Sequence, residues 1–338
     1  MENKHHSPEW IRDRIARIPR VEIALKPTPL HAMSMLERSL GGPRIFIKRD
    51  DLTGVALGGN KLRNLEFRLA HALKEKPDTV IVGLDLQSNS ARQTVGACNK
   101  LGLRTHLVLV GQKPQNIQGN LLCDYVLGAD VHFVADAQEQ AARIEQLMQE
   151  CKARGERPHN LSANPMFDIG SALAYIETTL EIQEQLQALG TAPTDIYMSS
   201  SGKGQAGIVL ARRLTGNGFR MHGITATSEF HVPSRTVAIA NDTARLLQLD
   251  LEITEDEIDN DGRFVGARYG VPSDASVEAV RLFARTEGIL LDPIYTGKAA
   301  AGMISHIREG RYGPDDVLVF VHTGGAPALF TWNESFLA

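Results

Sequence analysis

The sequence predicts an α/β fold made of two open, twisted and mostly parallel sheets with helices on both faces. Short apolar runs rich in β-branched residues alternate with helix-like stretches, the pattern of right-handed βαβ crossovers. This alternation restarts near residue 190, which indicates a second sheet. The chain has 338 residues, more than a single hydrophobic core usually absorbs. We therefore expect two α/β domains and a ligand site in the cleft between them.

Strands and helices alternate along the whole chain. In the first half, the expected strands are 45–47, 79–83, 106–110 and 131–134, and the expected helices are 61–73, 88–101, 119–126 and 138–154. A long helix is expected over 169–189. Beyond it, the expected strands are 195–198, 222–225 and 317–321, and the expected helices are 235–247 and one that starts at 205. The last strand is continuously apolar, as a strand buried on both faces should be.

Composition excludes several classes of function. The net charge of −4 predicts no electrostatic binding to nucleic acid or to an anionic membrane. No apolar run approaches the ~20 residues that span a bilayer, and the polar residues 1–6 do not resemble a secretory signal. The three cysteines lack CxxC spacing and the 11 histidines lack an HExxH motif, so we expect no disulfide framework, no metal site and a cytoplasmic setting.

Two segments carry polar or basic groups at the start of an expected helix. In segment 58–61 (Gly-Gly-Asn-Lys), the glycines permit a tight turn, and Lys61 lies where the helix dipole disfavours a positive charge. Formation of a Schiff base would explain such a lysine, whereas an exposed lysine after a loop is the alternative. Segment 87–90 (Gln-Ser-Asn-Ser) follows a strand, where it can bind a carboxylate or a phenolic oxygen, or simply cap the helix.

Three further segments could line a pocket. Segment 199–205 (Ser-Ser-Ser-Gly-Lys-Gly-Gln) joins a strand to a helix, and its backbone N–H groups can close around a phosphate. A flexible connection is the equally weighted alternative. Segments 292–298 (Asp-Pro-Ile-Tyr-Thr-Gly-Lys) and 322–325 (His-Thr-Gly-Gly) are interpreted as pocket walls, with a structural histidine as the alternative for His322.

Taken together, these segments resemble the fold-type II pyridoxal-phosphate enzymes, in the branch that holds D-cysteine desulfhydrase and 1-aminocyclopropane-1-carboxylate (ACC) deaminase. The similarity runs from segment 27–30 to segment 324–327. It rests on the motifs Ile47-Lys48-Arg49-Asp50-Asp51, Gly58-Gly59-Asn60-Lys61, Gln87-Ser88-Asn89, Tyr269-Gly270-Val271-Pro272, Asp292-Pro293-Ile294-Tyr295-Thr296-Gly297-Lys298 and His322-Thr323-Gly324-Gly325. The resemblance implies a tryptophan synthase beta-like fold, in which residues 61–169 form a smaller domain inserted into a larger one made of 1–60 and 170–338. It also implies a homodimer.

The resemblance assigns pyridoxal 5'-phosphate (PLP) as the cofactor and gives roles to particular residues. Lys61 would hold the cofactor covalently and move the α-proton of a small amino-acid substrate. Asn89 would bind the phenolic oxygen, and the substrate carboxylate would meet Gln87, Ser88 and Asn89, with Ser88 also a possible proton carrier. The phosphate would lie in the loop formed by Ser201, Gly202, Lys203, Gly204 and Gln205. The ring and substrate would be contacted by Tyr295, Tyr269 and, at the pyridine nitrogen, Thr296.

Thr296 favours one reaction within the branch. The cyclopropane deaminases carry glutamate at this position, and the desulfhydrases carry threonine. A hydroxyl does not force protonation of the ring nitrogen, so the cofactor is a weaker electron sink. This favours β-elimination on a small β-substituted amino acid, as in D-cysteine desulfhydrase, with pyruvate and ammonia as products. The alternatives are ACC deaminase activity and a repurposed, non-catalytic PLP-binding relative.

Several departures from the family pattern leave the substrate open. Ser90 replaces a usual histidine, Asp85 lies in a lead-in (Leu84-Asp85-Leu86) that is normally glycine-rich, and Asn64 replaces a second lysine. We hypothesise that Lys203 restores the charge that is missing at position 64. Segment 162–168 (Ser-Ala-Asn-Pro-Met-Phe-Asp) differs most, and its Met166, Phe167 and Asp168 would reshape the substrate pocket.

Overall fold

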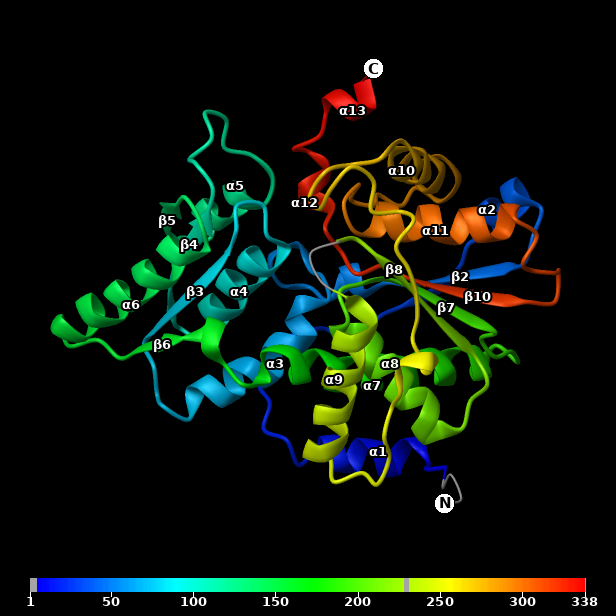
Figure 1. The fold of residues 1–338 in the computed structure, drawn as a ribbon, viewed down its shortest axis with the longest axis horizontal. Coiled ribbons are helices and arrows are strands. Elements are labelled where there is room, and N and C mark those ends of the chain that lie inside the picture. The colour runs from blue at the N-terminus through cyan, green and yellow to red at the C-terminus, as the bar shows by residue number, and fades with distance from the viewer. Residues whose placement is uncertain (1–4, 228–230, 338) are drawn as a thin grey trace. The chain divides into compact units, whose positions relative to one another are not determined.

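The computed structural model, which describes residues 5–227 and 231–337, confirms the α/β class and the mostly parallel sheets (Figure 1). The chain divides into two compact units. The first comprises Met1–Ile18, Lys26–Leu52 and Ser171–Ala338, and the second comprises Pro19–Leu25 and Thr53–Gly170.

The first unit is built on a six-stranded sheet. Its strands, in spatial order, are β1 (Leu30–Ala32), β2 (Arg44–Lys48), β10 (Val317–Val321), β7 (Asp195–Ser200), β8 (Arg220–Thr225) and β9 (Asp259–Asp261). All neighbours are parallel except β1 and β2. Strand β10 lies at the centre of the sheet and all five of its residues are buried, in agreement with the continuous apolar run.

Helices cover both faces of this sheet. On one face lie α2 (Ser34–Leu40), α10 (Asp274–Glu287) and α11 (Thr296–Arg308), and on the other lie α1 (Pro8–Ile15), α7 (Met166–Ala188), α8 (Lys203–Thr215) and α9 (Val232–Leu246) (Figure 1). The short helices α12 (Ala326–Leu329) and α13 (Glu334–Leu337) follow β10. An apolar cluster packs α10 and α11 against the sheet, and it includes Phe283 and Phe320, whose rings are in contact.

The second unit is built on a four-stranded, fully parallel sheet. Its strands, in spatial order, are β5 (Asp130–Val134), β4 (Arg104–Val110), β3 (Thr79–Asp85) and β6 (Pro158–Asn160). Its helices are α3 (Lys61–Leu73), α4 (Asn89–Lys100), α5 (Gly119–Val126) and α6 (Ala137–Ala153). One apolar cluster joins α3, α4 and α5 to the sheet, and a second, which includes Ile81 and Leu147, joins α6 to the other face.

The structure places the boundary between the units differently from the expectation, because residues 19–25 and 53–60 join the smaller unit. Hydrogen bonds explain both assignments. The backbone N–H groups of Ile23 and Ala24 each donate to a carboxylate oxygen of Glu66 at 3.0 Å. In segment 53–60, the Gly58 carbonyl accepts a hydrogen bond from the Arg92 guanidinium on α4 at 3.1 Å.

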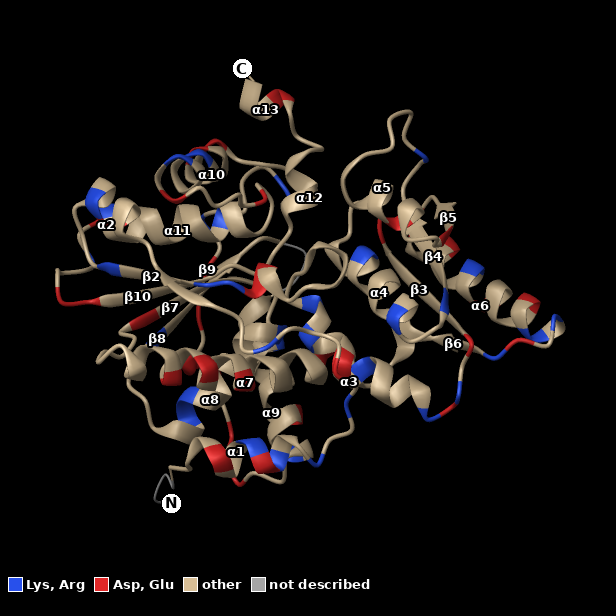
Figure 2. Ribbon diagram, turned by 180° about the vertical axis from the view of Figure 1, so that it is seen from behind, with Lys and Arg blue, Asp and Glu red and all other residues tan. Residues whose placement is uncertain are grey.

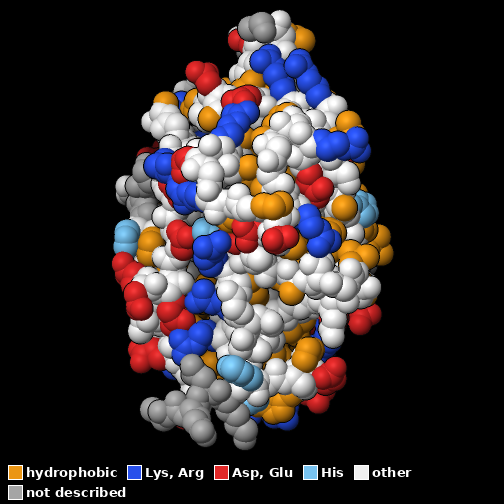
Figure 3. All heavy atoms as spheres, turned by 90° about the vertical axis from the view of Figure 1, so that its right-hand side faces the viewer, with side chains coloured by type: hydrophobic (Ala, Val, Ile, Leu, Met, Phe, Trp, Pro, Cys, Tyr) orange, Lys and Arg blue, Asp and Glu red, His pale blue; other side chains and the backbone are white. Residues whose placement is uncertain are grey.

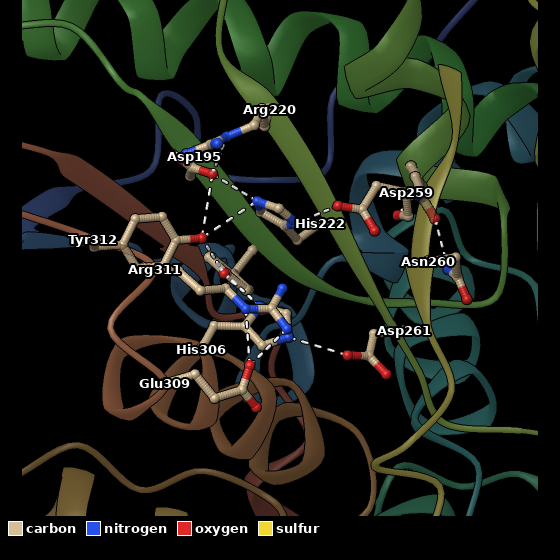
Figure 4. A network of polar contacts seen from close by, with 12 residues as sticks. Asp195, Arg220, His222, Asp259, Asn260, Asp261, His306, Glu309, Arg311 and Tyr312 are labelled. Atoms are coloured by element: carbon tan, nitrogen blue, oxygen red, sulfur yellow. Dashed lines mark hydrogen bonds and ion pairs between the residues drawn. The ribbon is translucent and has the colours of Figure 1, made fainter. Parts of the chain in front are cut away.

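A buried polar network lies at the N-terminal ends of strands β7 and β8 (Figure 4). Asp195 accepts hydrogen bonds from Arg220 at 2.8 Å and from His222 at 2.6 Å. The other ring nitrogen of His222 is 2.6 Å from the Asp259 carboxylate, and His306 on α11 is 3.1 Å from the Asp261 carboxylate. Ligands bind at the opposite, C-terminal ends of parallel strands, so we interpret this network as part of the scaffold.

Charges on the surface are mixed in sign. Lys and Arg alternate with Asp and Glu along helices such as α1 and α6 (Figure 2). The face drawn in Figure 3 likewise shows both signs interspersed. Within the described parts of the chain, no helix is both long enough and apolar enough to cross a bilayer.

Candidate active site

The loop before Lys61 has a backbone that only particular residues can adopt. Gly58 has a φ of 66° and Gly59 a φ of 124°, both in the left-handed region that favours glycine. A Cβ atom on Gly59 would lie 2.5 Å from the side-chain nitrogen of Gln93 on α4. Lys61 is the first residue of α3, as predicted. The glycines therefore allow the loop to pack directly on α4 and deliver Lys61 to the helix start.

Lys61 is a weaker base than an ordinary lysine. Burial of its ammonium group, followed by the positive charge of Arg68 two turns along α3, lowers its pKa to about 8. The neutral amine is the form that attacks a carbonyl group. At neutral pH, Lys61 therefore holds a far larger neutral fraction than the usual lysine pKa of 10.5 would give.

The start of α4 carries the Gln87-Ser88-Asn89 motif. Ser88 caps the helix, and its hydroxyl oxygen accepts hydrogen bonds from Ser90 N–H at 3.1 Å and Ala91 N–H at 3.3 Å. The capping interpretation is therefore confirmed for Ser88. The side-chain amide of Gln87 binds the start of α5, because its oxygen accepts from Asn120 N–H at 2.9 Å and its nitrogen donates to Gln118 O at 3.1 Å. The Asn89 side-chain oxygen accepts from the Asn120 amide at 2.9 Å.

Asn64 and segment 162–168, which both differ from the family pattern, are in contact with each other. The Asn64 amide donates to the Phe167 carbonyl at 3.1 Å, and the Arg68 guanidinium lies 4.5 Å from the centre of the Phe167 ring. Arg68 also donates to Leu161 O at 2.8 Å. The differences at Asn64 and in segment 162–168 therefore belong to one packed contact between α3 and this segment, and they are not independent of each other.

The loop between β7 and α8 is shaped at the C-terminal end of its strand. Gly202 has a φ of 98°, and its N–H donates to the Ser200 hydroxyl at 3.1 Å. A Cβ on Gly204 would lie 2.7 Å from Met198 Cε. The first helical hydrogen bond runs from Ala206 N–H to Gly202 O at 2.9 Å, so the N–H groups of 203–205 lie at the open end of α8, where an anion binds well.

The side chains around this loop have different tasks. The buried Gln205 side chain accepts from the Ser200 hydroxyl at 2.6 Å and donates to Asp259 O at 2.7 Å. The side chain of Gln205 therefore connects β7 to β9. Only the backbone N–H of Gln205 remains suited to binding a phosphate. Lys203 is the first residue of α8 and places a positive charge at the helix start, while Ser201 is exposed on the loop before it.

The two predicted tyrosines are in contact in the first unit. The hydroxyl groups of Tyr269 and Tyr295 lie 2.5 Å apart, and their rings meet edge to face with centroids 6.1 Å apart. Tyr295 immediately precedes α11, and Tyr269 lies in the loop before α10. The structure thus brings together two residues that are 26 positions apart in the sequence.

Thr296 is held by Asp292, a residue whose role the sequence did not reveal. The Thr296 hydroxyl donates to the Asp292 carboxylate at 2.6 Å. The same carboxylate accepts the backbone N–H groups of Ile294, Tyr295 and Thr296 at 2.9, 2.6 and 3.0 Å. Asp292 therefore fixes the start of α11 and directs the hydroxyl hydrogen of Thr296 towards itself.

His322 and Lys298 are buried and structural. Burial lowers the pKa of His322, which favours the neutral ring, and its Nδ1 accepts from Gly324 N–H at 3.3 Å. Lys298 donates to Val265 O at 2.6 Å. Among the residues that the structure describes, no three His, Cys, Asp or Glu side chains are arranged to hold a metal ion.

Each unit therefore gathers its own share of the predicted residues. The second unit holds Lys61 and the motif 87–89 at the starts of adjacent helices, and the first holds the loop 201–205, Tyr269, Tyr295 and Thr296. Reasoning from sequence missed Asn120, whose partners are distant in the chain, and the role of Asp292, whose partners are the next few residues.

Comparisons with known proteins identify the family of this chain. The model of the pyridoxal-phosphate dependent enzyme family matches residues 21–324. D-cysteine desulfhydrases of Salmonella paratyphi C and Salmonella choleraesuis are each 36% identical over 329 residues, which cover 94% of this chain and 98% of theirs. A solved ACC deaminase homologue is 30% identical with a TM-score of 0.85, covering 98% of this chain and 99% of that one. A threonine deaminase of Solanum lycopersicum, 15% identical with a TM-score of 0.65 over 98% of this chain and 89% of that one, shares the fold.

The family match covers both units of the chain, and the desulfhydrase and deaminase relatives match it over nearly their full lengths. The chain belongs to the pyridoxal-phosphate dependent enzyme family, in the branch of D-cysteine desulfhydrase and ACC deaminase.

Proposed function

We propose that this enzyme catalyses β-elimination on a small β-substituted amino acid of the D-cysteine type, releasing pyruvate and ammonia. The observation that carries the proposal is Thr296, whose hydroxyl is already bonded to the Asp292 carboxylate at 2.6 Å. A hydroxyl in this state offers no acidic proton to a pyridine nitrogen. Elimination of a good leaving group needs less electron withdrawal than opening of a cyclopropane, so this site favours elimination.

The residues present fit PLP. Lys61 supplies an amine whose pKa is lowered to about 8, and the open end of α8 supplies N–H groups for a phosphate. Asn89 supplies a side-chain amide for the phenolic oxygen. When bound, the cofactor withdraws electron density from the α-carbon of the substrate and so makes loss of the α-proton feasible.

The proposed steps assign one task to each residue. With PLP bound, Lys61 would remove the α-proton of the substrate with its neutral amine. The Ser88 hydroxyl and the Asn89 amide bind and orient the substrate carboxylate, while Gln87 contributes by holding α5 behind them. Tyr269 and Tyr295, whose hydroxyl oxygens lie 2.5 Å apart, would contact the substrate and the pyridine ring. Lys203 and the N–H groups of 203–205 would hold the phosphate.

We further propose that the enzyme acts in the cytoplasm as a homodimer. Its three cysteines, Cys98, Cys123 and Cys151, are free thiols, as a reducing compartment favours. Sedimentation of the purified protein at about twice its monomer mass would support the dimer, and a monomer mass would reject it.

The experiment that tests the function is a product assay on the PLP-loaded enzyme. D-Cysteine, L-cysteine and ACC are supplied separately, and 2-oxo acids are separated by chain length. Pyruvate from D-cysteine supports the proposal. A four-carbon 2-oxo acid from ACC would instead favour the deaminase alternative, which the 30% identical structure supports. Retention of PLP without turnover of any amino acid would favour a non-catalytic relative, as the departures at Asp85, Ser90 and Asn64 suggest.

A further inference from the structure

A chain of hydrogen bonds in the second unit runs from Arg92 through Asn120 to Asn89. Arg92 and Asn120 are fully buried, whereas Asn89 is partly exposed at the start of α4. The Arg92 Nε donates to the Asn120 side-chain oxygen at 2.7 Å. The Asn120 side-chain nitrogen then donates to Asn89 Oδ1 at 2.9 Å and to the Gln87 carbonyl at 2.9 Å.

The chemistry of arginine fixes the direction of this chain. A guanidinium only donates hydrogen bonds, so the Asn120 atom that faces Arg92 must be the oxygen. The other end of the Asn120 amide is therefore the NH₂ group, which can only donate. The Asn89 atom that it meets must in turn be an acceptor. The NH₂ group of Asn89 is thus directed away from Asn120, with both of its hydrogens outside this contact.

Arg92 is itself fixed by the loop that carries Lys61. Its Nη1 donates to the carbonyl groups of Ala56 and Gly58, the latter at 3.1 Å. Asp124, one turn after Asn120 on α5, is also buried, and burial raises its pKa to about 7. Gln93 adds a second tie, because its oxygen accepts from Leu62 N–H at 3.1 Å and its nitrogen donates to Asn89 O at 3.0 Å. The orientation of Asn89 and the position of the lysine loop are therefore set by the same helix.

We propose that Asn120 is a positioning residue that forces the Asn89 amide to present its NH₂ group, rather than its oxygen, to the phenolic oxygen of PLP. The inference rests on the proposed role of Asn89 in the proposed function. The phenolic oxygen is a hydrogen-bond acceptor, so a reversed Asn89 would repel it. Asn120 makes this choice without touching the cofactor.

The substitution Asn120→Asp tests this most sharply, because it preserves shape and reverses one end of the chain. The introduced carboxylate would still accept from Arg92, but its second oxygen would accept from the Asn89 amide and so turn the Asn89 oxygen outward. We expect the apoenzyme of this variant to bind PLP about tenfold more weakly, the effect of losing one charge-assisted hydrogen bond. The pH at which the visible band of the bound cofactor changes should also shift. Asn241→Asp is the matched control, since Asn241 likewise donates to a backbone carbonyl, Ile253 O, at 3.0 Å in the other unit.

A double-mutant cycle separates positioning from mere structure. In an Asn89→Ala background, Asn120→Asp should weaken PLP binding no further, because its effect acts through Asn89. Equal losses in both backgrounds, or wild-type affinity and spectrum in Asn120→Asp, would overturn the inference. If Asn120→Asp does not fold, Asn120→Ala releases the Asn89 amide instead, and unchanged PLP binding there would also overturn it. A wild-type protein that binds no PLP would reject the proposed function as well, so the two failures are distinguishable.

Discussion

Two buried polar networks, one in each unit, differ in how their hydrogen bonds end. In the Asp195 network, carboxylates and cations or imidazoles face each other: Asp195 with Arg220 and His222, and Asp261 with His306 (Figure 4). In the Asn89 network, donors follow one another in a single direction from Arg92 to Asn89. In the first network the charged groups pair with one another. The second network ends in the amide of Asn89, which it orients at the start of α4. We interpret the first network as part of the scaffold, and we propose that the second orients Asn89 for the cofactor.

The largest expected effect is on catalysis, and it concerns Lys61 in the unit that holds the Asn89 network. Lys61→Ala should abolish covalent attachment of PLP and reduce turnover by at least about 1,000-fold, since the same amine removes the α-proton. Borohydride reduction followed by peptide mass spectrometry measures the attachment. Lys100→Ala, at the end of α4, is the control. A reduced PLP adduct on a lysine other than Lys61 in the wild type would contradict the assignment.

The next effect concerns the scaffold. Asp195→Asn should lower the free energy of unfolding by about 3 kcal/mol, because it leaves the buried His222 beside a neutral group. PLP affinity should not change. Urea titration measures the difference, with Asp242→Asn as control: its pair with Arg245 is exposed, and such pairs contribute about 0.5 kcal/mol. Loss of PLP affinity in the Asp195 variant would show that the two networks are not separable.

A third variant sharpens the account of the phosphate loop. Lys203→Ala should weaken PLP binding about tenfold and leave the covalent link to Lys61 in place, because a charge-assisted contact is lost and N–H donors of the loop remain. Titration of PLP into the apoenzyme measures this. Unchanged affinity would reject the hypothesis that Lys203 replaces the charge missing at Asn64, whose side chain here binds Phe167 O.

The smallest expected effect is a pH dependence of the closed network. Burial opposes the charge on His222, but the carboxylates of Asp195 and Asp259 outweigh it and raise its pKa above 6.5. A raised pKa contributes stability below pH 6.5, and this contribution is lost as the pH rises through the folded-state value. The difference in unfolding free energy between wild type and His222→Gln should therefore be larger at pH 6 than at pH 9. A difference that grows with pH would contradict the charged pairing.

Much of the fold could be predicted because its elements carry local signals. The apolar run 317–321 and the helix 61–73 have the expected bounds. Helix α11 was missed: it is buried almost all round, and its buried face includes polar residues such as Thr296, Lys298 and His306, which are more common on exposed positions. Strand β9 was missed because it is short and polar and forms only by pairing with the distant β8.

The candidate site was predictable to the extent that motifs are contiguous. Ser88 is typical of a helix cap, and the glycines around Lys61 and Lys203 indicate turns. Asn120 carries no such signal, because its partners Asn89 and Gln87 lie 31 and 33 residues away. Gln205 was expected at the phosphate, yet its side chain is taken up by Ser200 and Asp259. Contacts across the fold decide such cases, and a single sequence does not encode them locally.

The central claim is that Lys61 holds PLP for β-elimination, and the visible absorption spectrum tests it most directly. The purified protein is scanned before and after addition of D-cysteine, while pyruvate is measured in the same cuvette. We expect a yellow lysine-bound cofactor band that shifts when D-cysteine is added, together with pyruvate. The absence of any band, even after PLP is supplied, would contradict the account.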